Sequence, residues 1–165
     1  MHPSKPRSPE NHNLYRTTAF RAAEAAGTGL LDHAKTGFRI DYKAATNLVT
    51  DADRRAEERI VHTILSAHPS HRILAEERGK DGATDSPYCW IIDPLDGTTN
   101  FAHGFPFYSV SIGLEYEGEC IVGVVFDPLR RELFTGALGQ GAYLNGGRLR
   151  AATIGTPDQS PLGTG

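Results

Sequence analysis

Residues 90–101 read Trp90-Ile91-Ile92-Asp93-Pro94-Leu95-Asp96-Gly97-Thr98-Thr99-Asn100-Phe101. The apolar run at the start of this stretch predicts a short buried strand. Pro94 has no N–H group to give to a sheet ladder, so we expect the strand to end there. The stretch therefore predicts two carboxylates, Asp93 and Asp96, on a tight turn at the end of a strand that enters the core.

Asp93 and Asp96 would repel each other at short range unless a positive charge lies between them. Mg²⁺ prefers oxygen ligands and binds one or two carboxylates together with substrate phosphate, and Leu95 can add a backbone carbonyl. Gly97 and Thr98 can direct backbone N–H groups and a hydroxyl at an anion, above all if a helix begins there. The turn therefore predicts a site for Mg²⁺ and phosphate.

Other interpretations of this turn fit the spacing to different degrees. Asp-Gly, Asn and Thr are ordinary turn residues, so Asp93 and Asp96 could simply cap a loop. An EF-hand loop needs acidic residues at every second position and a distant Glu, which is a different spacing. A phosphatase with a nucleophilic aspartate in an Asp-x-Asp-Gly-Thr pattern would have one residue fewer between the carboxylates. Taken alone, the turn leaves a metal site and a capped loop open.

The composition is that of an ordinary soluble globular protein. The chain has 165 residues, enough for one sizeable core, with 39% hydrophobic and 22% charged residues. A net charge of −3 gives no sign of general nucleic-acid or membrane-surface binding. No signal peptide or membrane-spanning run is evident, and Cys89 and Cys120 lie in predicted strands as small buried residues. We therefore expect a cytoplasmic protein.

A long helix is predicted near the start of the chain. Residues 1–12 are rich in proline and polar side chains, and we expect them to form a disordered tail. Residues 13–36 then repeat apolar side chains at about one helical turn. Gly27 and Gly29 weaken the middle of this helix, and Gly37 is its expected stop.

A second helix is predicted after a possible short strand over residues 38–43. Thr50 or Asp51 is a good N-cap for this helix, which should end near His68. Asp53 falls in its first turn, where an acidic side chain complements the helix dipole. Without other information, this structural role is the simpler interpretation of Asp53.

Residues 73–75 predict a short strand that runs into Glu76 and Glu77. If this strand lies beside the strand before Asp93, Glu76 comes close to Asp93. The alternative is that Glu76 and Glu77 belong to a solvated turn, as charged runs usually do. Residues 80–87 predict a polar loop.

After residue 101 the apolar pattern changes to a period of two. We expect strands near residues 110–114, 122–126, 133–137 and 141–144, joined by turns at 117–118, 127–128 and 145–147. Two helices followed by such an antiparallel meander indicate an α+β fold. His103 could be a ligand or a base, but a single His in a Gly/Pro turn is more often neither, and we leave it outside the site.

Three segments together resemble the inositol monophosphatase family of Mg²⁺-dependent, Li⁺-sensitive phosphatases. They are Lys43-x-x-x-Asn47-Leu48-Val49-Thr50-x-x-Asp53, Leu74-Ala75-Glu76-Glu77, and the stretch from Trp90 to Asn100-Phe101 followed by His103-Gly104-Phe105-Pro106. The resemblance runs from about Leu14 to the C-terminus. It implies an α+β fold, the layered α/β sandwich of the inositol monophosphatase and fructose-1,6-bisphosphatase type, here truncated on its C-terminal side.

The resemblance also implies a role for each candidate residue. The implied catalytic residues are Asp53, Glu76 and Thr98, of which Asp53 and Thr98 would orient the attacking water. The implied metal ligands are Glu76, Asp93, Asp96 and the carbonyl of Leu95. The implied substrate-binding residues are Glu76, Leu95, Asp96, Gly97 and Thr98. In such a site the metal lowers the pKa of bound water and offsets charge on the phosphate in the transition state.

The implied reaction is Mg²⁺-dependent hydrolysis of a small phosphate monoester, with inositol 1-phosphate as the first choice. Alternative substrates are fructose 1,6-bisphosphate, histidinol phosphate or a 3′-phosphoadenosine nucleotide. A different alternative is a non-catalytic role as a partner-binding protein in transcription or ribosome assembly. We expect a homodimer at full length, without direct nucleic-acid or membrane binding.

One feature of the family is missing from this sequence. Family members carry a later Trp-Asp motif whose aspartate completes the second metal site, whereas the only tryptophan here is Trp90. We therefore expect residues 13–165 to be the N-terminal, incomplete part of a metal-dependent phosphatase domain. We also expect this chain to be inactive on its own.

Overall fold

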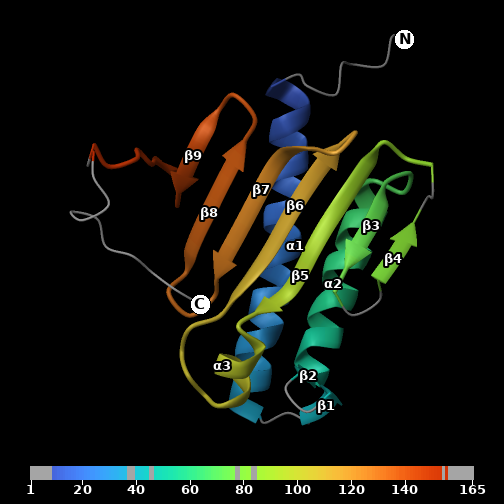
Figure 1. Cartoon of the computed structure of the whole chain (residues 1–165), viewed down its shortest axis with the longest axis vertical. Coiled ribbons are helices and arrows are strands. Elements are labelled where there is room, and N and C mark those ends of the chain that lie inside the picture. Colours follow the sequence, from blue (N-terminus) through green and yellow to red (C-terminus); the bar gives the residue numbers. More distant parts are fainter. Residues whose placement is uncertain are drawn as a thin grey trace.

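The computed structural model describes residues 9–36, 40–44, 47–76, 79–82, 85–153 and 155. Two helices, α1 (Pro9–Thr36) and α2 (Asp51–Ala67), lie side by side against one face of an eight-stranded sheet (Figure 1). A separate pair of strands, β1 (Ile40–Ala44) and β2 (Asn47–Thr50), connects the two helices. This two-layer arrangement is the α+β fold that the sequence predicts.

The large sheet has the strand order β10-β9-β8-β7-β6-β5-β3-β4. Its strands are β3 (Arg72–Ala75), β4 (Gly79–Gly82), β5 (Tyr88–Asp96), β6 (Ser109–Tyr116), β7 (Glu119–Asp127), β8 (Glu132–Ala137), β9 (Gly141–Leu144) and β10 (Gly147–Arg148). All neighbours are antiparallel except β3 and β5, which run parallel. The predicted meander is confirmed from β6 to β9. At its first turn, Glu117 and Gly118 both have positive φ, 51° and 82°, as the tightest hairpin turns require.

The core lies between the helices and the sheet. Trp90, Ile60 and Ile64 are fully buried, and α1 contributes mainly alanines, which let it approach the sheet closely. At Gly27 an added Cβ would lie 2.7 Å from the ring of Phe126 on β7. Gly27, which has a low helix propensity, therefore permits close contact between α1 and the sheet.

The prediction that the strand ends at Pro94 is wrong. β5 continues to Asp96, but Asp93 pairs with Ser111 and Asp96 pairs with Ser109 on β6. Three steps along one strand thus match two steps along the other, which is a β-bulge. A proline is tolerated at a bulge because its missing N–H is not needed for the ladder.

Three further expectations need correction. Helix α1 begins at Pro9 and not at residue 13, so residues 9–12 are helical. Residues 79–82 form the edge strand β4, within a segment predicted to be partly loop. Cys120 is exposed, whereas Cys89 is buried as predicted. Gly37, Glu77 and residues 1–8 lie outside the described residues.

The sheet face away from the helices is open in the described part of the chain. Leu74, Ile91 and Val125 point to this face and are 41%, 39% and 39% exposed. Across the strands, Gly113 pairs with Gly123 and Gly123 pairs with Gly136, so a row of glycines crosses the same face. In the described part of the chain, this apolar face of the sheet therefore lacks cover.

Candidate active site

The parallel pairing of β3 and β5 brings two acidic residues together. Ala75 pairs with Ile92 in this ladder, so the next residues, Glu76 and Asp93, leave the same edge of the sheet side by side. Asp96 follows after the bulge, on the same strand as Asp93. The structure thus confirms that Glu76 lies near Asp93, and it unites carboxylates from two separate sequence segments.

The electrostatics of Asp93 reflect this crowding. Burial and then the neighbouring carboxylates of Glu76 and Asp96 raise the pKa of Asp93 to about 6, although a hydrogen bond from the Leu95 N–H acts in the opposite direction. That N–H lies 3.1 Å from Asp93 Oδ1. A half-buried carboxylate beside two others is a place where a cation would relieve repulsion.

The acidic residues fit Mg²⁺ by chemistry, since all of them offer hard oxygen donors. Within the described residues, no three His, Cys, Asp or Glu side chains are already arranged to hold a metal ion. Glu76, Asp93 and Asp96, with the Leu95 carbonyl, are the residues that could bind the metal.

A single hydroxyl links the acidic turn to α2. Thr98 Oγ1 lies 3.2 Å from Asp53 Oδ1 and 3.0 Å from the carbonyl oxygen of Leu95. Asp53 is only 2% exposed and lies in the first turn of α2, as predicted. Asp53 therefore lies at a helix start, as its structural interpretation predicts, and also contacts Thr98 of the predicted site.

Gly97 shapes the turn that follows Asp96. Its φ of 90° and ψ of 36° are left-handed, and the short helix α3 (Thr98–Ala102) begins directly after it. A Cβ at Gly97 would lie 3.0 Å from the carbonyl oxygen of Phe107, so a side chain would be strained on both counts. The condition set from the sequence, a helix that begins at this turn, is met.

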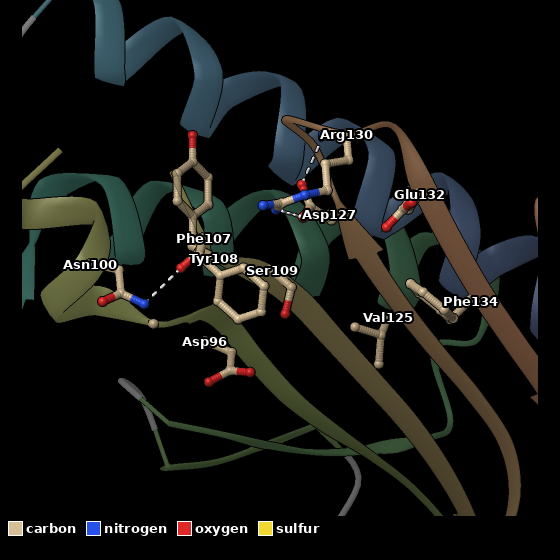
Figure 2. A pocket seen from close by; sticks show the side chains of 11 residues that line it. Asp96, Asn100, Phe107, Tyr108, Ser109, Val125, Asp127, Arg130, Glu132 and Phe134 are labelled. Atoms are coloured by element: carbon tan, nitrogen blue, oxygen red, sulfur yellow. Dashed lines mark hydrogen bonds and ion pairs between the residues drawn. The ribbon is translucent and has the colours of Figure 1, made fainter. Parts of the chain in front are cut away.

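A cavity of about 300 Å³ opens beside Asp96 and Gly97 (Figure 2). Its apolar walls include Phe107 and Phe134. Its rim carries Arg130, which pairs with Asp127 at 2.6 Å and lies 5.2 Å from the centre of the Phe107 ring.

Sequence reasoning missed these lining residues. The segments that meet at this cavity are distant in sequence, and Arg130 lies in a turn without a motif that marks it. His103 was kept outside the site. It is exposed, and its backbone N–H donates to the Thr99 carbonyl.

Residues 12–164 match the sequence profile described as "Inositol monophosphatase family". The chain belongs to this family. An inositol-1-monophosphatase from Synechocystis is 45% identical over 159 residues, which are 96% of this chain and 55% of that protein. The "Nus factor SuhB" of Escherichia coli K12 is 44% identical over 149 residues, 89% of this chain and 56% of that protein. The chain thus spans about half the length of the curated relatives it matches.

Solved structures agree with this assignment. The extragenic suppressor protein suhB from Bartonella henselae superimposes with a TM-score of 0.82 at 37% identity, covering 86% of this chain and 55% of that one. A structure described as IMPase/NADP phosphatase complexed with Mg²⁺ and phosphate has a TM-score of 0.65 at 26% identity, covering 72% of this chain and 46% of that one. The predicted family and sandwich fold are confirmed, with the chain corresponding to the N-terminal portion. No helix in the described part of the chain is long and apolar enough to cross a membrane.

Proposed function

We propose that this chain carries the acidic metal site of a Mg²⁺-dependent phosphatase that hydrolyses a small phosphate monoester, with inositol 1-phosphate as the first substrate to test. The observation that supports this most is the convergence of Glu76 and Asp96 on Asp93, whose pKa is raised to about 6. Family membership supports the same chemistry. We further propose a cytoplasmic protein that forms a homodimer at its native length.

The proposed roles are those that the family resemblance implies, and the contacts of the turn support them. Mg²⁺, when bound to Glu76, Asp93, Asp96 and the Leu95 carbonyl, supplies a water of lowered pKa. Thr98 can donate a hydrogen bond to Asp53, 3.2 Å away, which leaves a lone pair of the Thr98 oxygen to accept a hydrogen bond from that water and so orient it.

The proposed phosphate contacts come from the same turn. The N–H groups of the first residues in a helix have no intrahelical carbonyl partner. The N–H groups of Gly97 and Thr98 are therefore proposed to hold phosphate oxygens at the start of α3. Glu76 and the Leu95 carbonyl would contact the substrate through the metal.

The direct test is Mg²⁺-dependent phosphate release from inositol 1-phosphate by the protein at its native length. We expect release by the wild type and a loss of at least about a hundredfold in Asp93→Asn, because the substitution removes a charged ligand. If wild type and Asp93→Asn release no phosphate from any monoester tested, the phosphatase proposal fails. Fructose 1,6-bisphosphate, histidinol phosphate and a 3′-phosphoadenosine nucleotide form the substrate panel.

A second candidate function has its own supporting observation, the 44% identity to a relative named as a Nus factor. In this case the protein would bind a partner in transcription, and the acidic site would be incidental to that role. The test is recovery of RNA polymerase from a cell extract by wild type and by Asp93→Asn. Equal recovery by both, together with no phosphatase activity, would favour the binding role over the enzyme.

A further inference from the structure

Asn100 lies in the middle of α3 and holds the loop that follows this helix. Its side-chain Nδ2 donates a hydrogen bond to the carbonyl oxygen of Phe107 at 2.8 Å (Figure 2). Its backbone carbonyl accepts a hydrogen bond from the N–H of Phe105 at 2.8 Å. One residue therefore makes two bonds to the loop between α3 and β6, one at Phe105 near its middle and one at Phe107 near its far end. The contact between Asn100 and Phe107 spans seven positions of an irregular loop, so the spacing of the motif residues does not reveal it.

At Phe105 and Phe107 these bonds hold the loop, and burial of the side chains does not. Phe105 and Phe107 are each 59% exposed, so neither ring anchors the loop in the core. The next residue, Tyr108, is buried and packs its ring edge-on against Phe101 at 5.0 Å. The hydrogen bond from Asn100 therefore sets the backbone directly before this buried anchor.

The held carbonyl lies against the acidic turn. The Phe107 oxygen is 3.0 Å from the position that a Cβ of Gly97 would occupy, and the Cα of Tyr108 is 3.4 Å from it. Two residues after Phe107, Ser109 pairs with Asp96 across the bulged end of β5 and β6. A displacement of the Phe107 carbonyl would therefore move the backbone on both sides of Asp96.

We propose that Asn100 is a positioning residue for the metal site, which fixes Asp96 by holding the Phe107 carbonyl over Gly97. This inference rests on the proposed function, since it concerns the same acidic turn. Asn100 does not touch the metal or the substrate in this role. It acts through the backbone of the loop and of the Asp96–Ser109 pair.

The test compares Asn100→Ala with Thr99→Ala in this chain, using Mn²⁺ as the probe. Thr99 is exposed on the same helix. Both substitutions raise the helix propensity of α3, so a change in helix stability alone would affect the two variants alike. Mn²⁺ binding is measured by electron paramagnetic resonance, with Asp93→Asn as the control that removes the site. We expect Asn100→Ala to weaken Mn²⁺ binding by about threefold to tenfold, and Thr99→Ala to leave it within about twofold, with similar melting temperatures for both variants.

A second measurement decides the inference independently of metal binding. Amide hydrogen exchange of residues 96–98 and 107–109, without metal, should be faster in Asn100→Ala than in wild type and Thr99→Ala. Equal Mn²⁺ affinity or equal exchange in the two alanine variants would overturn the positioning role. If wild type binds Mn²⁺ no better than Asp93→Asn, the proposed metal site fails, and hydrogen exchange alone decides whether Asn100 fixes the turn.

Discussion

Protonation of His71 should destabilise this protein strongly in mild acid. His71 is 6% exposed, its Nδ1 accepts a hydrogen bond from the indole N–H of Trp90 at 3.0 Å, and its ring stacks on Tyr88 at 4.3 Å and on His68 at 4.8 Å. Burial, and then the neighbouring His68, lower the pKa of His71 from 6.5 to about 4. A protonated Nδ1 also cannot accept the indole N–H, which would leave a buried donor without its partner.

The sign and size of the effect follow from linkage. Because the pKa of His71 is lower in the folded than in the unfolded state, its contribution to stability is present above about pH 6.5 and is lost as pH falls toward 4. At about 1.4 kcal/mol per pKa unit, the full loss is about 3 kcal/mol. Roughly 2 kcal/mol of this should develop between pH 7 and about pH 4.5.

The assay is urea unfolding at low protein concentration, followed by the fluorescence of Trp90, the only tryptophan and a fully buried one. Asp93 acts in the opposite direction, because its raised pKa, about 6, makes the folded state more stable as pH falls. The comparison is therefore between wild type and His71→Asn, which keeps an oxygen acceptor but does not titrate.

The variant should lose roughly 2 kcal/mol less stability than wild type over this pH range. The exposed His62→Asn control should follow wild type. The same pH dependence in wild type and His71→Asn would refute the reasoning.

Four other outcomes are expected. In the phosphatase assay, Glu76→Gln and Asp93→Asn should each lower activity by at least about a hundredfold more than His103→Ala, since only the first two remove proposed ligands; equal losses would contradict the site. Mn²⁺ affinity should fall as pH drops below about 6, because protons then compete for Asp93, whose pKa is raised to about 6; a flat titration from pH 7 to about 5 would contradict this. Gly27→Ala should lower the free energy of unfolding by about 1–3 kcal/mol through overpacking against a rigid ring 2.7 Å away, whereas Gly29→Ala meets the flexible end of an arginine and should cost less. The open sheet face should make this chain associate as its concentration rises, and a clean monomer at all concentrations in size-exclusion chromatography would argue against that.

Apolar periodicity was enough to predict most of the fold, because buried residues recur with a different spacing in helices and in regular strands. It failed where the ladder is irregular. Cys120 shares the phase of the inward-facing Val122, yet Leu114 pairs with Val122 while Glu115 pairs with Cys120. The extra residue between them reverses the alternation, so Cys120 is exposed. Strand β4 was missed because its Gly-Lys-Asp-Gly sequence has no apolar pattern, and only the backbone of β3 defines it.

In the candidate site, too, some contacts could be predicted from the sequence and others could not. Glu76 could be placed near Asp93 from sequence because each residue directly follows a predicted strand. If two such strands lie side by side and run parallel, the residues that follow them are neighbours, and the pairing of Ala75 with Ile92 has this register. The hydrogen bond from Asn100 to the Phe107 carbonyl could not be placed, since a loop has no register from which to count. The contact between the Thr98 hydroxyl and Asp53, 45 positions apart, is likewise not given by spacing, and only the family resemblance brings these two residues together. A motif therefore predicts which groups do the chemistry, whereas the contacts that fix their positions come from segments whose spacing in sequence carries no information about distance.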